Sequence, residues 1–134
     1  MTDQMLPTRR HVLAAAALGA AGAPLLAGCG DGTNPAPSAG DAIARLEDLP
    51  DGGVKVVMTN AGSPVVLFRD GERVTALSGV CTHQGCSVRN EVKHLLCPCH
   101  NSKFDFEGVP FEGPATEPLP PLDVMVEGGD VVVA

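Results

Sequence analysis

The sequence lacks large aromatic side chains and is poor in positive charge. It has no Trp, no Tyr and only four Phe, so few aromatic anchors are available for a core or an interface. Its 9 Lys and Arg stand against 16 Asp and Glu, which gives a formal net charge of −7. Because an acidic surface repels phosphate backbones, this balance argues against nucleic acid as a partner.

Long helical patterns are also lacking after the first thirty residues. Short apolar runs rich in β-branched residues alternate with turn residues, and Gly and Pro together number 28 (16 plus 12). With 134 residues in total, we expect one small, all-β, antiparallel domain that needs a covalent or metal staple. The expected strands are 54–59, 65–69, 73–77, 87–92, 94–96, 103–106, 109–111, 123–127 and 131–133.

The first 28 residues have the composition of an export signal. Residues 8–13 read Thr-Arg-Arg-His-Val-Leu, a twin-arginine pattern, and an uncharged Ala- and Gly-rich run follows over residues 12–27. The run is shorter than the roughly 20 apolar residues of a membrane-spanning helix, so we interpret residues 1–28 as a signal peptide. A plain N-terminal helix with a chance Arg pair is the alternative.

The apolar run ends in Leu-Ala-Gly before Cys29, which resembles the lipobox of bacterial lipoproteins. The resemblance implies that Cys29 is lipidated and anchors the chain at the outer face of the bacterial cytoplasmic membrane. The alternative is a simple cleavage site that happens to precede a Cys. Residues 29–42 hold two Pro and no large apolar side chain, which predicts a flexible tether before a folded domain over residues 43–134.

Two short segments place Cys and His side by side. Residues 81–86 read Cys-Thr-His-Gln-Gly-Cys, and residues 97–102 read Cys-Pro-Cys-His-Asn-Ser. Thiolates suit iron clusters, and imidazole suits iron and zinc alike. A Cys2His2 zinc site is the alternative, but structural zinc sites usually pair two Cys and then two His. Zinc also leaves two of the four Cys in these segments without a role.

The two segments, C-T-H-x-G-C and C-P-C-H-x-S, resemble the motifs of the Rieske family, and the resemblance covers roughly residues 43–134. It implies a [2Fe–2S] cluster with Cys81 and Cys97 on one iron and His83 and His100 on the other. It also implies an antiparallel β-sandwich with the cluster at the tip of a small cluster-binding subdomain. Neutral imidazoles raise the reduction potential of such a centre to about −150 to +300 mV.

The additional Cys in each segment resembles the high-potential branch of the family, which includes quinol-oxidising bc-type complexes and arsenite oxidase small subunits. With the ligands assigned in this way, Cys86 and Cys99 remain to form a disulfide, which an oxidising compartment preserves. Residues 113–121, which begin Gly-Pro-Ala and hold three further Pro, resemble the proline-rich loop that covers the cluster.

Four residues around these motifs bear on the potential and on docking. In the family, the hydroxyl at Ser102 bonds a bridging sulfur. Quinol-oxidising members usually carry Tyr two residues later, so Phe104 predicts a lower potential than theirs. Gln84 replaces an apolar residue near the quinone pocket, and Asn101 replaces the usual Gly. His94 has no motif, and we interpret it as structural.

Taken together, these features predict an extracytoplasmic one-electron carrier between membrane or exported oxidoreductases, with redox proteins as partners. By resemblance, His83 and His100 expose their outer nitrogens at the tip as the electron exit. The alternatives are the Rieske subunit of a quinol–cytochrome c reductase (a bc-type complex), the small subunit of an exported molybdenum oxidase and a non-redox zinc module. The sequence has no recognisable carboxylate pair or nucleophile–base motif for a substrate pocket of its own.

Overall fold

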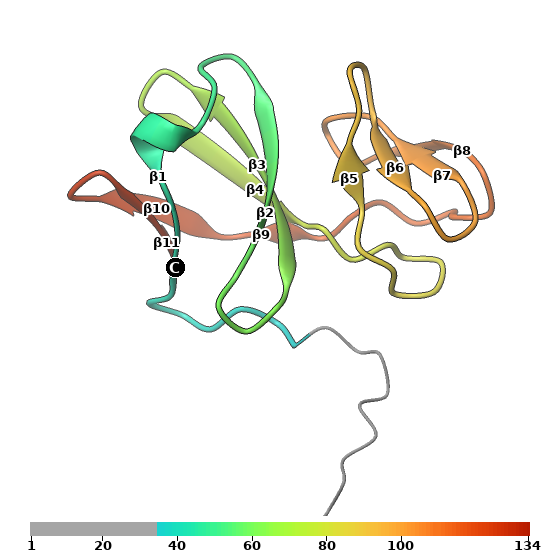
Figure 1. Ribbon diagram of the computed structural model, residues 1–134, viewed down its shortest axis with the longest axis horizontal. Helices are drawn as coiled ribbons and strands as arrows, with labels where there is room; N and C mark the ends of the chain where they lie inside the picture. Colours follow the sequence, from blue (N-terminus) through green and yellow to red (C-terminus); the bar gives the residue numbers. More distant parts are fainter. Residues whose placement is uncertain (1–34) are drawn as a thin grey trace, which may run out of the picture.

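The computed structural model describes residues 35–134, which form three antiparallel sheets (Figure 1). The twin-arginine segment, the lipobox and Cys29 lie outside the described residues. Within residues 35–134 the only helical piece is a three-residue 3-10 turn, η1, so no helix in this part of the chain is long and apolar enough to cross a bilayer. The expected all-β class is confirmed.

The strands follow one another along the chain with short connections. Their bounds are β1 (Ala42–Arg45), η1 (Leu46–Asp48), β2 (Val54–Met58), β3 (Pro64–Asp70), β4 (Arg73–Ser78), β5 (Arg89–Asn90), β6 (Leu95–Cys97), β7 (Ser102–Phe104), β8 (Pro110–Glu112), β9 (Pro121–Leu122), β10 (Val124–Glu127) and β11 (Asp130–Val133). The strand orders are β1-β11-β10, β2-β3-β4-β9 and β5-β6-β7-β8.

The first two sheets form a base, and the third forms a smaller subdomain beside it (Figure 1). β4 leads into the subdomain, and the chain returns to the base at β9, whose residues pair with β4. The segments with the Cys and His residues lie before β5 and between β6 and β7. The expected sandwich with a small additional subdomain is therefore confirmed.

The strand β3 is covered on both faces and joins two cores. Val65 and Leu67 belong to the core between the two base sheets, and Val66 belongs to the core shared with the subdomain. Successive side chains of a strand point to opposite faces, so an uninterrupted apolar run suits a strand buried on both sides. This central strand fixes the subdomain against the base.

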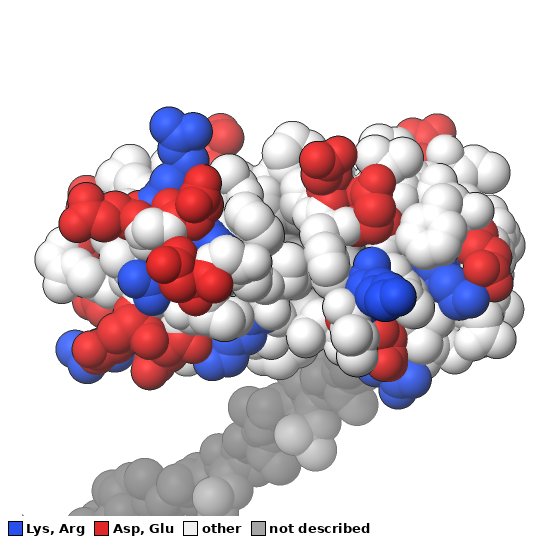
Figure 2. All heavy atoms as spheres, turned by 90° about the horizontal axis from the view of Figure 1, so that it is seen from above, with Lys and Arg blue, Asp and Glu red and all other residues white. Residues whose placement is uncertain are grey.

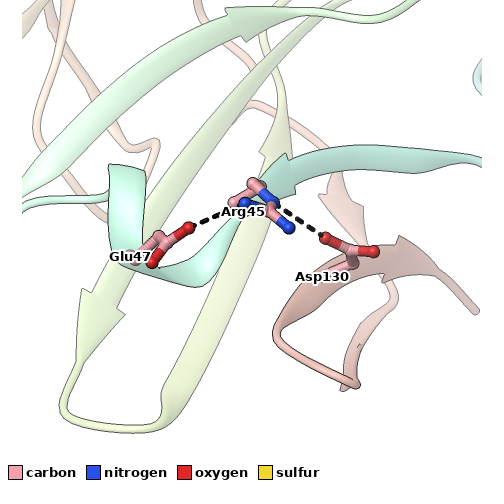
Figure 3. Close-up of polar contacts among 3 residues, drawn as sticks. All are labelled: Arg45, Glu47 and Asp130. Carbon is pink, nitrogen blue, oxygen red and sulfur yellow. Dashed lines mark hydrogen bonds and ion pairs between the residues drawn. The ribbon is translucent and has the colours of Figure 1, made fainter.

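Two arginines hold the chain after β1. Arg45 places Nη1 2.9 Å from Glu47 Oε1 and Nε 3.7 Å from Asp130 Oδ1 (Figure 3). Because these side chains are exposed, such pairs contribute at most about 1 kcal/mol. Arg69 contributes more to the architecture, since its Nη1 donates to two carbonyl oxygens of residues 46–49 and so ties this segment to β3.

Charge is unevenly distributed over the molecule. On the face in Figure 2, Asp and Glu side chains gather over the end that holds β1, β10 and β11. Residues 78–88 and 95–102, which contain both Cys and His segments, include no Asp, Glu, Lys or Arg. The two segments therefore carry no formal charge apart from what their histidines acquire.

The strand predictions are largely right, and the differences have local causes. The expected strand 87–92 shortens to β5, because the backbone N–H of Glu91 donates to the carbonyl of His94 and closes a turn. The expected strand 103–106 ends at residue 104, where Asp105 accepts the N–H groups of Glu107 and Val109. The sequence patterns do not predict β1 or β9.

Candidate metal centre

Two loops carry the Cys and His segments, and local hydrogen bonds shape both. In the first, the N–H of Cys81 donates to Cys86 O at 2.7 Å, and the N–H of Gly85 donates to Cys81 O at 2.9 Å. The second is the turn at residues 98–101 between β6 and β7, closed by the pairing of Cys97 with Ser102. Both segments are therefore tight turns held at strand ends.

Two cysteines are free thiols and lie together in the core. Cys81 and Cys97 are each 2% exposed, and their side chains are neighbours. Burial raises the pKa of the Cys81 thiol, and Cys97 adds to the rise, against the backbone N–H groups of His83 and Gln84, which lower it. Both thiols must lose their protons to bind a metal, and the same N–H groups then stabilise the thiolate.

The two histidines of the motifs meet edge to face. The ring centroids of His83 and His100 lie 4.8 Å apart with an interplanar angle of 83°. His83 is half-buried, and its Nδ1 is buried with no hydrogen-bond partner. Leaving such an atom unpaired costs about 1–3 kcal/mol, whereas metal coordination satisfies it. The donor set is therefore two buried thiols and two imidazoles, which fits an iron–sulfur cluster.

A disulfide joins the two loops. Cys86 and Cys99 are bonded, with a sequence separation of 13, so the expected pairing is confirmed. The Sγ atoms of Cys86, Cys97 and Cys99 lie within 4.8 Å of one another. Because two of these sulfurs are consumed by the disulfide, they cannot act as thiolate ligands, and only Cys97 of this group remains available to a metal.

The residues expected to surround the cluster lie close to the ligand loops. Ser102 and Phe104 are both 0% exposed, and Phe104 shares a core cluster with Cys81 and Cys97. In contrast, Gln84 is exposed on the first loop, as is His100 on the second. Phe104 therefore lines the interior side of the site, and Gln84 and His100 lie on its outer side.

Asn101 adopts a left-handed backbone conformation with φ of 60°, and no other non-glycine residue in the described part of the chain has a positive φ. Asn is one of the few side chains that tolerate this region. The substitution of Asn for the usual Gly therefore keeps the turn between His100 and Ser102.

The proline-rich segment is pinned to both ligand loops. Thr82 Oγ1 donates to Glu117 O at 2.8 Å, and the N–H of Ala115 donates to Ser102 Oγ at 3.1 Å. Sequence reasoning identified the segment by its prolines and missed Thr82, Ala115 and Glu117. No local signal marks these three residues. Both hydrogen bonds use a backbone group, and in each the two partners are more than ten residues apart in the sequence.

His94 lies away from the centre. Its ring is half-buried and contacts the ring of Phe111 edge to face, with centroids 6.1 Å apart. An imidazole packed on an exposed aromatic ring is consistent with the structural role expected for it.

Comparison with known proteins agrees with this geometry. The model of the Rieske [2Fe-2S] domain family matches residues 41–123, which is more than half of the chain. A carotenoid phi-ring synthase of Chlorobaculum tepidum is 42% identical over 102 residues, covering 71% of this chain and 16% of the relative. A cytochrome b6-f complex iron-sulfur subunit of the same organism is 35% identical over 95 residues, covering 69% and 52%. The chain thus spans about half, or much less, of these relatives.

A solved structure shows the same fold. The cyanobacterial plasma membrane Rieske protein PetC3 from Synechocystis superposes with a TM-score of 0.56 at 28% identity, covering 69% of this chain and 97% of that chain. The disulfide between the ligand loops agrees with the high-potential branch. The chain belongs to the Rieske [2Fe-2S] domain family, whose cofactor is a [2Fe–2S] cluster.

Proposed function

We propose that this chain is an extracytoplasmic one-electron carrier whose cluster is held by Cys81, His83, Cys97 and His100. The unpartnered Nδ1 of His83 is the observation that carries the ligand assignment, because a buried imidazole nitrogen without a donor or acceptor fits a metal ligand. The two free thiols lie beside each other in the core, so both Cys and both His converge on one site.

The arrangement gives the four ligands different tasks. The thiols of Cys81 and Cys97 are buried, so as thiolates they would hold one iron of the cluster away from water. His83 is half-buried and His100 is exposed, so electrons leave and enter through the imidazole side. The cluster supplies a site that gains and loses one electron, and the protein holds it rigidly between two turns joined by a disulfide.

The two loops that carry His83 and His100 offer a partner no charged Asp, Glu, Lys or Arg side chain for an ion pair. Residues 78–88 and 95–102 contain no Asp, Glu, Lys or Arg, and the largest group of acidic side chains in Figure 2 lies over the base. Docking at the ligand loops therefore depends on hydrogen bonds from groups such as the Gln84 amide and on apolar contact. We infer a redox protein with an uncharged docking site as the partner.

The location outside the cytoplasm rests on two supports. The disulfide between Cys86 and Cys99 persists in an oxidising compartment, and it is rare in cytosolic proteins. The twin-arginine signal in residues 1–28 and Cys29 provide an export route and a lipid anchor, with the residues that follow Cys29 as the tether. The tether is shorter than the expected residues 29–42, because β1 begins at Ala42 and pairs with β11. The domain over residues 43–134 then works at the outer face of the cytoplasmic membrane.

The ligand assignment is tested with a matched pair of histidine substitutions. His100→Ala should abolish the visible absorption and the electron paramagnetic resonance signal of the cluster. His94→Ala should keep both, because His94 contacts Phe111 and lies outside the site. A His100→Ala protein with the spectrum of the wild type would rule out this ligand set.

Export and anchoring are tested on the full chain in a bacterium with a twin-arginine pathway. The wild type should fractionate with the membrane and be accessible to protease added outside the cytoplasmic membrane. Cys29→Ser should appear in the soluble extracytoplasmic fraction, and a double Arg9→Lys, Arg10→Lys change should keep the protein inside. Membrane association that survives Cys29→Ser would refute lipid anchoring.

A second candidate is the Rieske subunit of a bc-type complex, which the likeness to a cytochrome b6-f iron-sulfur subunit favours. In that role the imidazole of His83 or His100 would accept a proton of the quinol, and the cluster would supply the one-electron acceptor. Sensitivity of electron transfer to quinol-site inhibitors, together with co-purification of a cytochrome b, would establish this role instead of the free carrier.

A further inference from the structure

We propose that Gly113 and Ala115 are positioning residues that aim the hydroxyl proton of Ser102 at the cluster and thereby help to set its reduction potential. The contact that carries this inference is the hydrogen bond from the Ala115 N–H to Ser102 Oγ, 3.1 Å long and buried. The inference rests on the [2Fe–2S] cofactor and does not depend on the partner or the location.

The hydroxyl proton of Ser102 has no acceptor among the described protein groups that surround it. A serine hydroxyl has one donor proton and two acceptor lone pairs. Ser102 is 0% exposed, so bulk water does not reach it, and the Ala115 N–H occupies one lone pair. In residues 35–134 no protein group accepts the hydroxyl proton of Ser102. The amide on one side therefore turns the proton away from the proline-rich loop.

The place of Ser102 in the sheet decides where that proton can go. Ser102 pairs with Cys97 across β6 and β7, so it starts the strand directly beyond the turn that carries His100. Cys97 is a buried free thiol with Cys81 as its neighbour. Because no described protein group takes this proton, a sulfur atom of the bound cluster would be its acceptor. A hydrogen bond to such a sulfur stabilises the reduced state and raises the potential.

Gly113 makes this contact possible because it lets the loop approach the backbone of the ligand turn. Its φ is +95°, and a Cβ there would lie 2.5 Å from Ser102 Cα and 2.8 Å from Asn101 O. A contact this short with backbone atoms cannot be relieved by a side-chain rotation. Any larger residue must lift the loop, and with it the Ala115 amide two residues later.

The test is a double-substitution cycle on the holoprotein, read as the midpoint potential in a redox titration. Ser102→Ala should lower the potential, and Gly113→Ala should lower it by most of the same shift. Because both changes remove the same oriented hydroxyl, Gly113→Ala should add nothing in the Ser102→Ala background. The absorption spectrum reports cluster loading separately from the potential.

Two controls separate positioning from general damage. Gly62 has a similarly positive φ of +84°, but no described residue other than its chain neighbours lies within 4 Å of the place where a Cβ would be. Gly62→Ala should therefore keep the wild-type potential. Ala115→Pro removes the amide donor and should act like Gly113→Ala, whereas Ala115→Gly keeps the donor and should behave like the wild type.

Three results would overturn the proposal. The first is a loaded Gly113→Ala protein with the wild-type potential, and the second is an equal shift in the presence and absence of the Ser102 hydroxyl. The third is failure of both Gly113→Ala and Ala115→Pro to bind a cluster, because a positioning role predicts loaded proteins.

Discussion

Removing the disulfide between the ligand loops should speed the loss of the cluster by up to two orders of magnitude. The change is Cys86→Ala together with Cys99→Ala. The bond has a sequence separation of 13, and closing a loop of that length removes about 3 kcal/mol of chain entropy from the unfolded state. Since 1.4 kcal/mol corresponds to a factor of ten, the population of opened molecules rises by about 100-fold.

Strand pairing between the two cysteines adds little to the disulfide. Between the two cysteines, β5 and β6 pair through two residue pairs only, Arg89 with Leu96 and Asn90 with Leu95. The strand β6 is held on its other side by β7. Opening of the first loop away from the second is therefore limited by the disulfide together with the contacts of the proline-rich segment, so the 100-fold effect is the upper end of what the variant should show.

The assay follows the visible absorption of the holoprotein at a fixed guanidinium concentration in a buffer without thiols. A rate is measured because cluster loss is irreversible and no equilibrium free energy is defined. Wild type treated with dithiothreitol should decay like the variant, and dithiothreitol should leave the variant unchanged. Equal decay rates for wild type and variant without reductant would refute the reasoning.

Three further changes have sharp expectations. Phe104→Tyr should raise the midpoint potential by about 40 to 60 mV, which is the equivalent of one hydrogen bond for a one-electron couple. The control is Phe68→Tyr, which adds a hydroxyl in β3 of the base and should leave the midpoint potential unchanged. An unchanged midpoint potential for Phe104→Tyr in a redox titration would contradict the effect expected from the missing hydroxyl. Asn101→Ala should lower the free energy of unfolding by about 1–2 kcal/mol, because the backbone at this position has a φ of 60°. It should also lower the temperature of cluster loss, whereas Asn101→Gly should not. Arg45→Ala should lower the free energy of unfolding by about 1 kcal/mol or less, because the Arg45 side chain is 67% exposed. The temperature of cluster loss should therefore change little.

Much of the site could be read from the sequence because its signals are local. Cys81 and His83 are separated by one residue, and Cys97 and His100 by two, so each turn presents one Cys and one His whatever the rest of the chain does. The strands β2, β3 and β4 are predicted nearly at their observed bounds, since alternation and the Asp70-Gly71 turn act over a few residues.

The missing elements have non-local causes. β1 is four residues long and is a strand because it pairs with β11 at the other end of the chain. β9 has only two residues and begins with a proline, and it is a strand because it pairs with β4. Neither segment has enough residues to show a period of its own, so no pattern within it distinguishes it from a loop.

The sequence alone placed one Cys and one His in each of two turns and predicted the all-β character of the domain, because residue spacing and side-chain alternation are properties of short segments. Only the tertiary structure decided that His83 Nδ1 is buried without a partner, that Cys81 and Cys97 meet, and that Ala115 donates to Ser102. These contacts join residues 13 and 16 positions apart or depend on burial by several strands at once. They exist only after the sheets have assembled and water has been excluded from between them.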